Sequence, residues 1–274
     1  LRAMLPFSQV FVRQLCLAGG MTQASAKSNL LVKVPAVTAF FWVIKVLSTT
    51  VGETLGDTLN DTWGLGLAKA GLVMGIVFAA LLVLQMSLRK YVPMVYWATI
   101  IAVSTFGTLI TDNLHDNFGW ENWQSALTFG IALAAVFAIW WAQERTLSIK
   151  TINTRKREFF YWLAILATFA MGTAGGDIFL DDLGWPLLNS TILFTVIIVI
   201  IAVMWNTKAI NPVLGFWSIY ILTRPLGASL GDGLSLPSPD GLNLGTALVT
   251  GVDLTIVAAL VIYLSFTKRD LITE

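Results

Sequence analysis

The chain has 274 residues, of which 56% are hydrophobic and 12% are charged, and its mean hydropathy is +0.76. Soluble domains contain about a quarter charged residues, so this composition excludes an ordinary soluble protein and indicates an integral membrane protein. The net charge of +1 gives no reason to expect nucleic acid as a partner, whereas the lipid bilayer is an expected one. The single cysteine, Cys16, cannot form a disulfide within the chain.

One short pattern occurs four times, without internal gaps. Each copy reads aromatic residue, Trp, nine residues, Gly, three residues, Gly or Thr, and Asp, and the Trp positions are Trp42, Trp97, Trp162 and Trp217. A fixed internal period indicates a repeat architecture. We therefore expect four repeats, at residues 34–90, 91–150, 151–208 and 209–266. Residues 1–33 are expected to be a poorly ordered N-terminal segment, because Arg13 interrupts their apolar run, and residues 267–274 form a C-terminal tail.

Each repeat contains two apolar runs that are long enough to span a bilayer, since about 20 residues at 1.5 Å per residue cross a hydrocarbon core of about 30 Å. The first runs cover residues 35–59, 93–114, 158–179 and 212–232, and the second runs cover 65–88, 122–143, 187–206 and 243–265. The runs are continuous rather than alternating, which disfavours a β-barrel. The sequence therefore predicts an all-α integral membrane protein with eight transmembrane helices.

The basic residues predict the orientation of these helices. Of the 17 Lys and Arg residues, 14 lie in the N-terminal segment, the joints between repeats or the C-terminal tail, and none lies in the loops within repeats. Positive charge near helix ends marks the cytoplasmic side, so both termini are expected there and the loops within repeats on the outside. Because each repeat has two helices, the four repeats are predicted to be parallel rather than inverted.

The recurring Trp and Gly positions have architectural interpretations. A Trp near the inner end of a transmembrane helix is typical of the membrane interface, so we predict an interfacial belt in preference to a ligand cage. Small residues four apart let helices approach closely, and we predict that the first helices pack inside the bundle through them. These packing positions are Gly52, Gly56, Gly107, Thr111, Gly172, Gly176, Gly227 and Gly231.

The recurring Asp suggests chemistry. It follows the Trp by fifteen residues, about 22 Å along a helix, which places it in the outer part of the membrane. Carboxylates at membrane depth face a bundle interior or an aqueous cavity and indicate an ion or proton path; the alternative is a solvated carboxylate at a helix end with a structural role. The candidate ion-binding or relay residues are Glu53, Asp57, Asp112, Asp177 and Asp232.

Three basic residues, Lys45, Lys69 and Arg224, fall within the apolar runs. Lys45 lies two turns inward of Glu53, and Arg224 has the same relation to Asp232, so both are candidate counter-ions. Asp253 is a further candidate partner for Lys69 or Arg224. Such pairs are either fixed structural contacts or charges that compete with a cation for the carboxylates, and the sequence leaves both interpretations open.

His115, the only histidine, lies between Asp112 and Asp116. This spacing allows His115 and Asp116 to ligate a divalent metal, and oxygen-rich sites suit magnesium or manganese; the alternative is a polar residue in an outer loop. The chain contains no phosphate-binding loop, nucleophile elbow, zinc-binding His-Glu pair or cysteine cluster. We therefore expect no enzymatic activity and no resident cofactor, with a divalent cation only as a substrate.

With these residues the chain resembles a bacterial family of membrane-anchored proteins that contain four tandem copies of a short repeat of unknown function. In that family each copy has two transmembrane segments and a characteristic tryptophan. The resemblance covers about residues 33–266 and rests on the four Trp residues with their Gly and Asp positions. It implies a location in the bacterial inner membrane and the repeat architecture, but no particular activity.

Two functions remain open. The first is a transporter or channel for a small cation, either a divalent metal such as Mn²⁺ or Mg²⁺ or a proton-coupled ion, with an acidic vestibule on the outer side. The second is a membrane scaffold or sensor that transports nothing. Its carboxylates would be structural, and its basic joint Arg155–Arg157 would meet a partner or anionic lipid.

Overall fold

The computed structural model describes residues 32–272, and within this range the chain is helical and contains no strand. The first helices of the four repeats are α2 (Ala39–Asp57), α4 (Pro93–Asp116), α6 (Arg155–Asp177) and α8 (Pro212–Ser235). The second helices are α3 (Leu67–Ser87), α5 (Asn122–Glu144), α7 (Leu187–Asn206) and α9 (Thr246–Thr267). The predicted all-α fold with two helices in each repeat is confirmed.

Local sequence explains where the inner helices begin and end. Pro93 and Pro212 occupy the first turns of α4 and α8, where a missing N–H costs little, and a hydroxyl of Thr38 or Thr154 caps α2 or α6. The first and third repeats differ from the others at the opposite end. There α2 and α6 continue into single π-helical turns, Thr58–Thr62 and Ile178–Asp182, which extend these helices beyond their predicted ends at 59 and 179.

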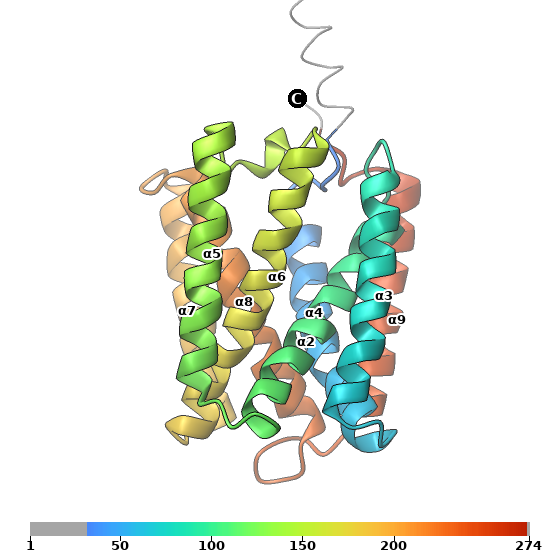
Figure 1. Cartoon of the computed structure of the whole chain (residues 1–274), viewed down its shortest axis with the longest axis vertical. Coiled ribbons are helices and arrows are strands. Elements are labelled where there is room, and N and C mark those ends of the chain that lie inside the picture. Colours follow the sequence, from blue (N-terminus) through green and yellow to red (C-terminus); the bar gives the residue numbers. More distant parts are fainter. Residues whose placement is uncertain (1–31, 273–274) are drawn as a thin grey trace, which may run out of the picture.

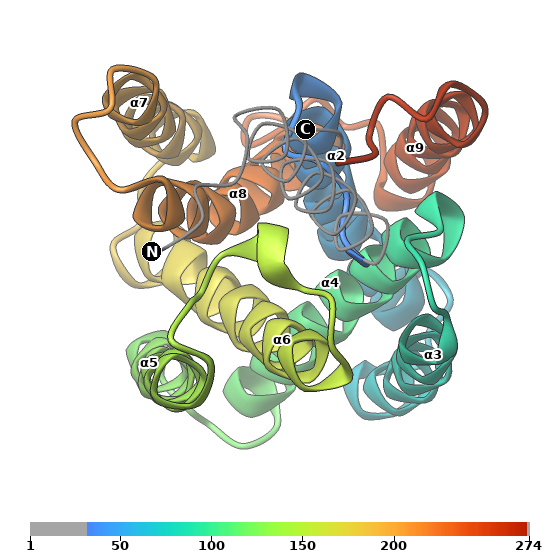
Figure 2. The ribbon, with the colours of Figure 1, turned by 90° about the horizontal axis from the view of Figure 1, so that it is seen from above.

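The helices form an inner ring and an outer layer. Viewed from above, α2, α4, α6 and α8 surround the centre, and α3, α5, α7 and α9 lie outside them (Figure 2). Each inner helix packs against the two neighbouring inner helices, and α8 closes the ring on α2. Each outer helix packs chiefly on the first helix of the following repeat, with α9 returning to α2. The four repeats therefore form one closed unit.

Glycines allow the inner helices to approach closely. In every contact of the ring, the glycine ten residues after the Trp of one repeat meets the residue seven after the Trp of the next. The pairs are Gly52 with Ser104, Gly107 with Phe169, Gly172 with Arg224, and Gly227 with Thr49. A Cβ atom on Gly172 would lie 2.7 Å from Cβ of Arg224, closer than van der Waals contact allows. The small residue is therefore required by the distance between the helices.

The two ends of the bundle are distinct (Figure 1). We call the end that contains residues 32 and 272 and the joints 88–92, 145–154 and 207–211 the joint end. The opposite end contains the loops within repeats and is called the loop end. The joints all lie at one end, as parallel two-helix repeats require.

Seven of the described helices, α3 to α9, are long and apolar enough to cross a membrane. Helix α2 is not among them; it contains Lys45 and Glu53 and packs against α4, α8 and α9. Protein rather than lipid surrounds much of α2, so polar residues on this helix can be accommodated. Large apolar side chains are exposed along the outer helices, for example Leu72 and Leu188, which are each 67% exposed.

The interior near the joint end is filled by an aromatic collar. We use this name for the four Trp residues of the repeat pattern and the aromatic residue that precedes each of them. Each preceding residue packs on the Trp of the next repeat around the ring, with centroid distances of 5.6, 5.7, 6.1 and 5.8 Å. These pairs are Phe41 with Trp97, Tyr96 with Trp162, Tyr161 with Trp217, and Phe216 with Trp42.

The predicted interfacial belt is therefore wrong for three of the four Trp residues. Trp97, Trp162 and Trp217 are at most 4% exposed, and only Trp42 is partly exposed. The prediction placed them correctly near one end of their helices, which is the joint end, but these helices pack against several neighbouring helices. The indole rings accordingly pack between repeats and do not reach the lipid.

The segments that flank the repeats pack against the joint end. Of the predicted N-terminal segment, residues 1–31 lie outside the described part of the chain, while Val32 and Lys33 are buried. The Lys33 ammonium pairs with the Glu158 carboxylate at 2.6 Å. In the C-terminal tail, Asp270 accepts a hydrogen bond of 2.6 Å from the Tyr91 hydroxyl. Two buried polar contacts thus hold the flanking segments at the joint end.

Candidate functional site

Carboxyl groups from the inner helices gather near the loop end of the bundle. Carboxylate oxygens of Glu53 and Asp57 on α2 and of Asp232 on α8 lie within 4.8 Å of one another. Asp112 on α4 and Asp177 on α6 are close enough to Glu53 to interact with its charge. The four aspartates that share one position in the repeat therefore converge on one region, which we call the acidic cluster together with Glu53.

The acidic cluster is graded in its exposure. The four aspartates are partly exposed, whereas Glu53, one helical turn closer to the joint end, is only 9% exposed. Asp57 and Asp177 are followed directly by the π-helical turns, which are frequent at functional sites. An ion from the loop end would reach the aspartates first and Glu53 last.

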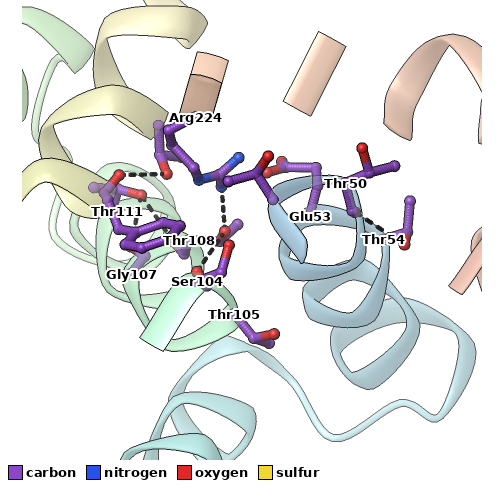
Figure 3. A network of polar contacts seen from close by, with 12 residues as sticks. Thr50, Glu53, Thr54, Ser104, Thr105, Gly107, Thr108, Thr111 and Arg224 are labelled. Carbon is purple, nitrogen blue, oxygen red and sulfur yellow. Dashed lines mark hydrogen bonds and ion pairs between the residues drawn. The ribbon is translucent and has the colours of Figure 1, made fainter. Parts of the chain in front are cut away.

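Arg224 lies at the inner limit of the acidic cluster, where its side chain meets Glu53 and Thr108 (Figure 3). Its guanidinium donates from Nη2 to Oε2 of Glu53 at 2.5 Å and to the hydroxyl of Thr108. The residue is 1% exposed, and its Nε and Nη1 atoms have no hydrogen-bond partner among the described residues. The charge of Arg224 also acts on all four aspartates. The sequence paired Arg224 with Asp232, but its direct partner is Glu53.

The ion pair is a local departure from fourfold symmetry. Eleven residues after the Trp, the four repeats have Glu53, Thr108, Thr173 and Ala228; seven residues after it, they have Thr49, Ser104, Phe169 and Arg224. The one acid and the one base of these two sets come from the first and fourth repeats, whose helices α2 and α8 are neighbours in the ring. Thr108 was missed as a site residue, although it is the in-register equivalent of Glu53.

The charge of this region requires neutralisation. Five carboxyl groups face one guanidinium, so full ionisation would leave four negative charges without a balancing cation among the residues of the cluster. Buried like charges are costly unless protons or cations compensate them. The donor atoms are all oxygen, the ligand type that Mg²⁺, Mn²⁺ and Ca²⁺ prefer. The arrangement can therefore hold protons or a hard cation.

Lys45 does not act as the predicted counter-ion of Glu53. Its ammonium donates to the Thr223 hydroxyl at 3.2 Å and lies 4.2 Å and 4.3 Å from the ring centroids of Phe169 and Tyr220. It has no carboxylate partner within residues 32–272. The side chain extends toward the aromatic residues because the Glu53 position is taken by Arg224 from the neighbouring helix.

The other predicted charge partners do not meet. Lys69 is exposed at the start of α3, whereas Asp253 is buried in α9 and its Oδ2 atom lacks a hydrogen-bond partner in the described part of the chain. Neither Lys69 nor Arg224 pairs with Asp253. Asp253 lies on an outer helix, so it belongs to a different layer from the acidic cluster.

His115 and Asp116 do not belong to the acidic cluster, and the metal site predicted for them stays a prediction. The Nδ1 atom of His115 lies 2.8 Å from the carbonyl oxygen of Trp120, so the ring bonds to the backbone of its own loop. Asp116 is exposed, and neither residue belongs to the group of close carboxylates. The helix ends at Asp116, and the two side chains therefore lie beyond the ring interior.

The closed ring, the apolar outer helices and the repeat pattern define the chain as an all-α, multi-pass membrane protein built from four two-helix repeats. A family model described as a repeat of unknown function (DUF347) matches residues 40–91, 95–146, 160–209 and 215–270, and the chain belongs to this family. The match confirms the resemblance drawn from the Trp, Gly and Asp positions. No curated protein and no solved structure matches the chain.

Proposed function

We propose that the protein is a gated transporter for a small cation, such as Mn²⁺, Mg²⁺ or a proton-coupled ion. The observation that supports this proposal is the gathering of Glu53, Asp57 and Asp232 within 4.8 Å, inside a ring of four helices. Intramembrane acids with excess negative charge are typical of ion and proton pathways. A purely structural carboxylate has no need of four like charges around it.

In this proposal the chain lies in a bacterial inner membrane with the loop end outward and both termini in the cytoplasm. The basic residues at the joint end, including Lys90, Arg145 and Lys208, support that orientation. The acidic cluster then receives cations from outside. Acidic residues of the loops, including Asp61 and Asp181, raise the local cation concentration before binding.

The aromatic collar favours a gated carrier over an open channel. Between Glu53 and the joint end, the interior is filled by Arg224, Lys45 and the buried rings of the collar. Two buried positive charges oppose the passage of a cation in this conformation. Transport thus requires a second conformation in which these side chains move. A cation bound by Glu53 would displace Arg224, which links binding to that change.

The competing function is a scaffold that transports nothing. Its strongest sequence feature was the basic joint Arg155–Arg157. Within this joint, Arg157 and Lys156 contact the Glu144 carboxylate at 2.8 Å and 3.2 Å, and Arg157 also donates to the Thr151 carbonyl. These internal contacts reduce the charge available to an external partner, which is why we favour transport.

Flux through liposomes that contain the purified protein tests the proposal. Uptake of Mn²⁺ and Mg²⁺ is followed with an encapsulated fluorescent chelator for the wild type, Asp57→Asn, Asp112→Asn and the control Asp240→Asn, whose side chain is exposed in the α8–α9 loop. We expect the first two variants to lose about tenfold or more of the initial rate, as loss of a charged ligand implies, and the control to keep it.

Thermal unfolding of each variant in detergent shows whether the fold survives. Wild-type flux in both Asp57→Asn and Asp112→Asn would contradict the role of the acidic cluster. A folded wild type that moves neither metal nor protons would support the scaffold.

A further inference from the structure

Tyrosines are concentrated in the interior near the joint end. Four of the five tyrosines of the chain, Tyr91, Tyr96, Tyr161 and Tyr220, are at most 6% exposed there. Packing alone does not require their hydroxyl groups. At the repeat position of Tyr96 and Tyr161, the first and fourth repeats have phenylalanine, and those rings pack on their Trp neighbours in the same way. The hydroxyls thus call for another explanation.

The hydroxyl groups are arranged in sequence from the joint end into the core. At the joint end the Tyr91 hydroxyl donates to Oδ2 of Asp270 at 2.6 Å. The ring of Tyr91 lies 5.6 Å from that of Tyr96. The hydroxyls of Tyr96 and Tyr161 are 2.5 Å apart. Hydroxyl-bearing rings therefore follow one another from the joint end into the aromatic collar.

The inner end of this sequence reaches Lys45. The Tyr220 hydroxyl is buried without a hydrogen-bond partner among the described residues, and it lies within electrostatic range of Tyr96 and Tyr161. The Lys45 ammonium lies 4.3 Å from the Tyr220 ring centroid and donates to Thr223. Thr223 directly precedes Arg224, which binds Glu53. Polar side chains thus recur from the joint end to the Glu53–Arg224 ion pair, with gaps between the Tyr91 and Tyr96 hydroxyls and at the Tyr220 hydroxyl.

We propose that Asp270, the four buried tyrosines and Lys45 form a proton pathway through the joint half, so that the proton is the ion coupled to cation transport. This inference rests on the proposed function for its coupling partner. In this conformation the buried rings of the collar fill the interior, whereas a proton can pass between hydroxyl groups without a pore.

The chemistry needs only proton transfers. Each tyrosine oxygen accepts a proton through a lone pair while its own O–H proton passes to the next acceptor, so every hydroxyl ends the step unchanged. A neutral Lys45 amine takes the last proton and becomes the ammonium ion described above, which then gives the proton up toward the carboxyl groups of the acidic cluster and so returns to the amine. Where two hydroxyls do not touch, one water molecule completes the hydrogen-bonded chain. No oxidant, reductant or leaving group is involved.

Asp270 is suited to the start of the pathway at the joint end. Burial raises the pKa of its carboxyl above the ordinary value of 3.8, and the hydrogen bond from Tyr91 opposes this rise only in part. Its second oxygen, Oδ1, is buried and has no partner within residues 32–272. A carboxyl with a raised pKa keeps a proton at higher pH than an exposed aspartate does. To pass this proton inward, Asp270 must donate to the Tyr91 oxygen, which reverses the hydrogen bond that Tyr91 donates to Asp270 here.

The test uses tyrosine-to-phenylalanine variants, which remove one oxygen and keep the ring. Liposomes containing the full chain are loaded with a pH-sensitive dye, the membrane potential is clamped, and proton movement is measured with and without Mn²⁺. The variants are Tyr96→Phe and Tyr161→Phe. The matched control is Tyr263→Phe, since Tyr263 lies on α9, is 38% exposed and belongs to none of the contacts above. Mn²⁺ binding to each protein in detergent is measured in parallel.

We expect both interior variants to lower proton movement by about tenfold or more, because each interrupts a buried hydrogen bond. Mn²⁺ binding should stay at the wild-type level, and Tyr263→Phe should match the wild type in both measurements. Phenylalanine occurs at this position in two repeats, so the fold should persist.

Two results would overturn the inference: Mn²⁺ movement by the wild type without proton movement, or wild-type proton rates in both Tyr96→Phe and Tyr161→Phe. Failure of the proposed function gives a different result. If the wild type does not bind Mn²⁺ but moves protons, and Tyr96→Phe and Tyr161→Phe slow that movement, the proton pathway stands and metal transport is contradicted.

Discussion

The two halves of the bundle interior have opposite chemistry, although the same four helices build both. Toward the loop end, five carboxyl groups surround Arg224. Toward the joint end, the aromatic collar fills the space, and the cation within it, Lys45, rests on aromatic rings. The scaffold of both halves comes from residues that all four repeats share. All four repeats also supply the aspartates of one half and the tryptophans of the other. The ion pair and the buried hydroxyls come from residues that one or two repeats have alone, such as Glu53, Arg224 and Tyr96.

The largest effect is expected from removing the cation of the acidic half. In Arg224→Gln the carboxyl groups lose the positive charge that acts on all of them, and an uncompensated buried charge costs about 3–5 kcal/mol. Glu53→Gln should cost less, because Arg224 keeps its attraction to the aspartates. Thermal unfolding in detergent compares the two variants. Equal losses of stability would mean that the Glu53–Arg224 pair is isolated from the rest of the acidic cluster.

A smaller effect is expected at the glycine layer between the two halves. Gly172→Ala places a Cβ atom 2.7 Å from Arg224, whereas a Cβ on Gly175 of the same helix meets nothing within 4 Å. Overpacking of this kind costs about 1–3 kcal/mol. Gly175→Ala should be neutral or stabilising, since alanine favours helix by up to about 1 kcal/mol. The unfolding temperatures of Gly172→Ala and Gly175→Ala test this prediction, and equal values would contradict close packing of α6 on α8.

The smallest effect is expected at the joint end and depends on pH. Because burial raises the pKa of Asp270 above 3.8, the folded state binds this proton more tightly than the unfolded state does. The resulting stability is fully present below pH 3.8 and is lost as the pH rises through the raised pKa. Asp270→Asn removes this dependence.

Unfolding temperatures of the wild type and Asp270→Asn at about pH 4 and about pH 8 measure the pH effect. The unfolding temperature of Asp270→Asn, taken relative to that of the wild type, should be higher at the higher pH than at the lower pH. Tyr91→Phe is the companion variant: it removes the hydrogen bond that lowers the pKa of Asp270, so it should make the pH dependence stronger. A constant difference between wild type and Asp270→Asn would contradict the assignment.

The repeats made much of the fold predictable. A regular spacing of Trp, Gly and Asp defined the repeats, and the continuous apolar runs predicted two helices in each. The basic residues in the joints, together with two helices in each repeat, also predicted that the joints lie at one end of the bundle, as they do (Figure 1). The candidate site was predictable in part. Four of the five acids were selected because they recur at one depth along the helices, and Glu53 because it lies one turn deeper on the same helix. Depth follows directly from residue number at 1.5 Å per residue.

The partners across the ring were harder to predict. Lys45 and Arg224 were each paired with an acid on their own helix, but Arg224 binds Glu53 from the neighbouring helix. The Trp residues were placed at the right depth but on the wrong side, facing lipid. Tyr91 and Asp270 were not selected at all. They come from a joint and from the C-terminal tail, and 179 positions separate them.

The sequence by itself determined the helices, their common direction and the depth of every repeated residue, because these follow from local periodicity and hydropathy. Tertiary structure decided which way each side chain points and which charges meet. Closing α8 onto α2 brings the first and fourth repeats together, and only this closure joins Glu53 to Arg224. The rotation of a helix about its own axis depends on the surfaces of its neighbours, and a single sequence does not specify those surfaces until the ring is formed.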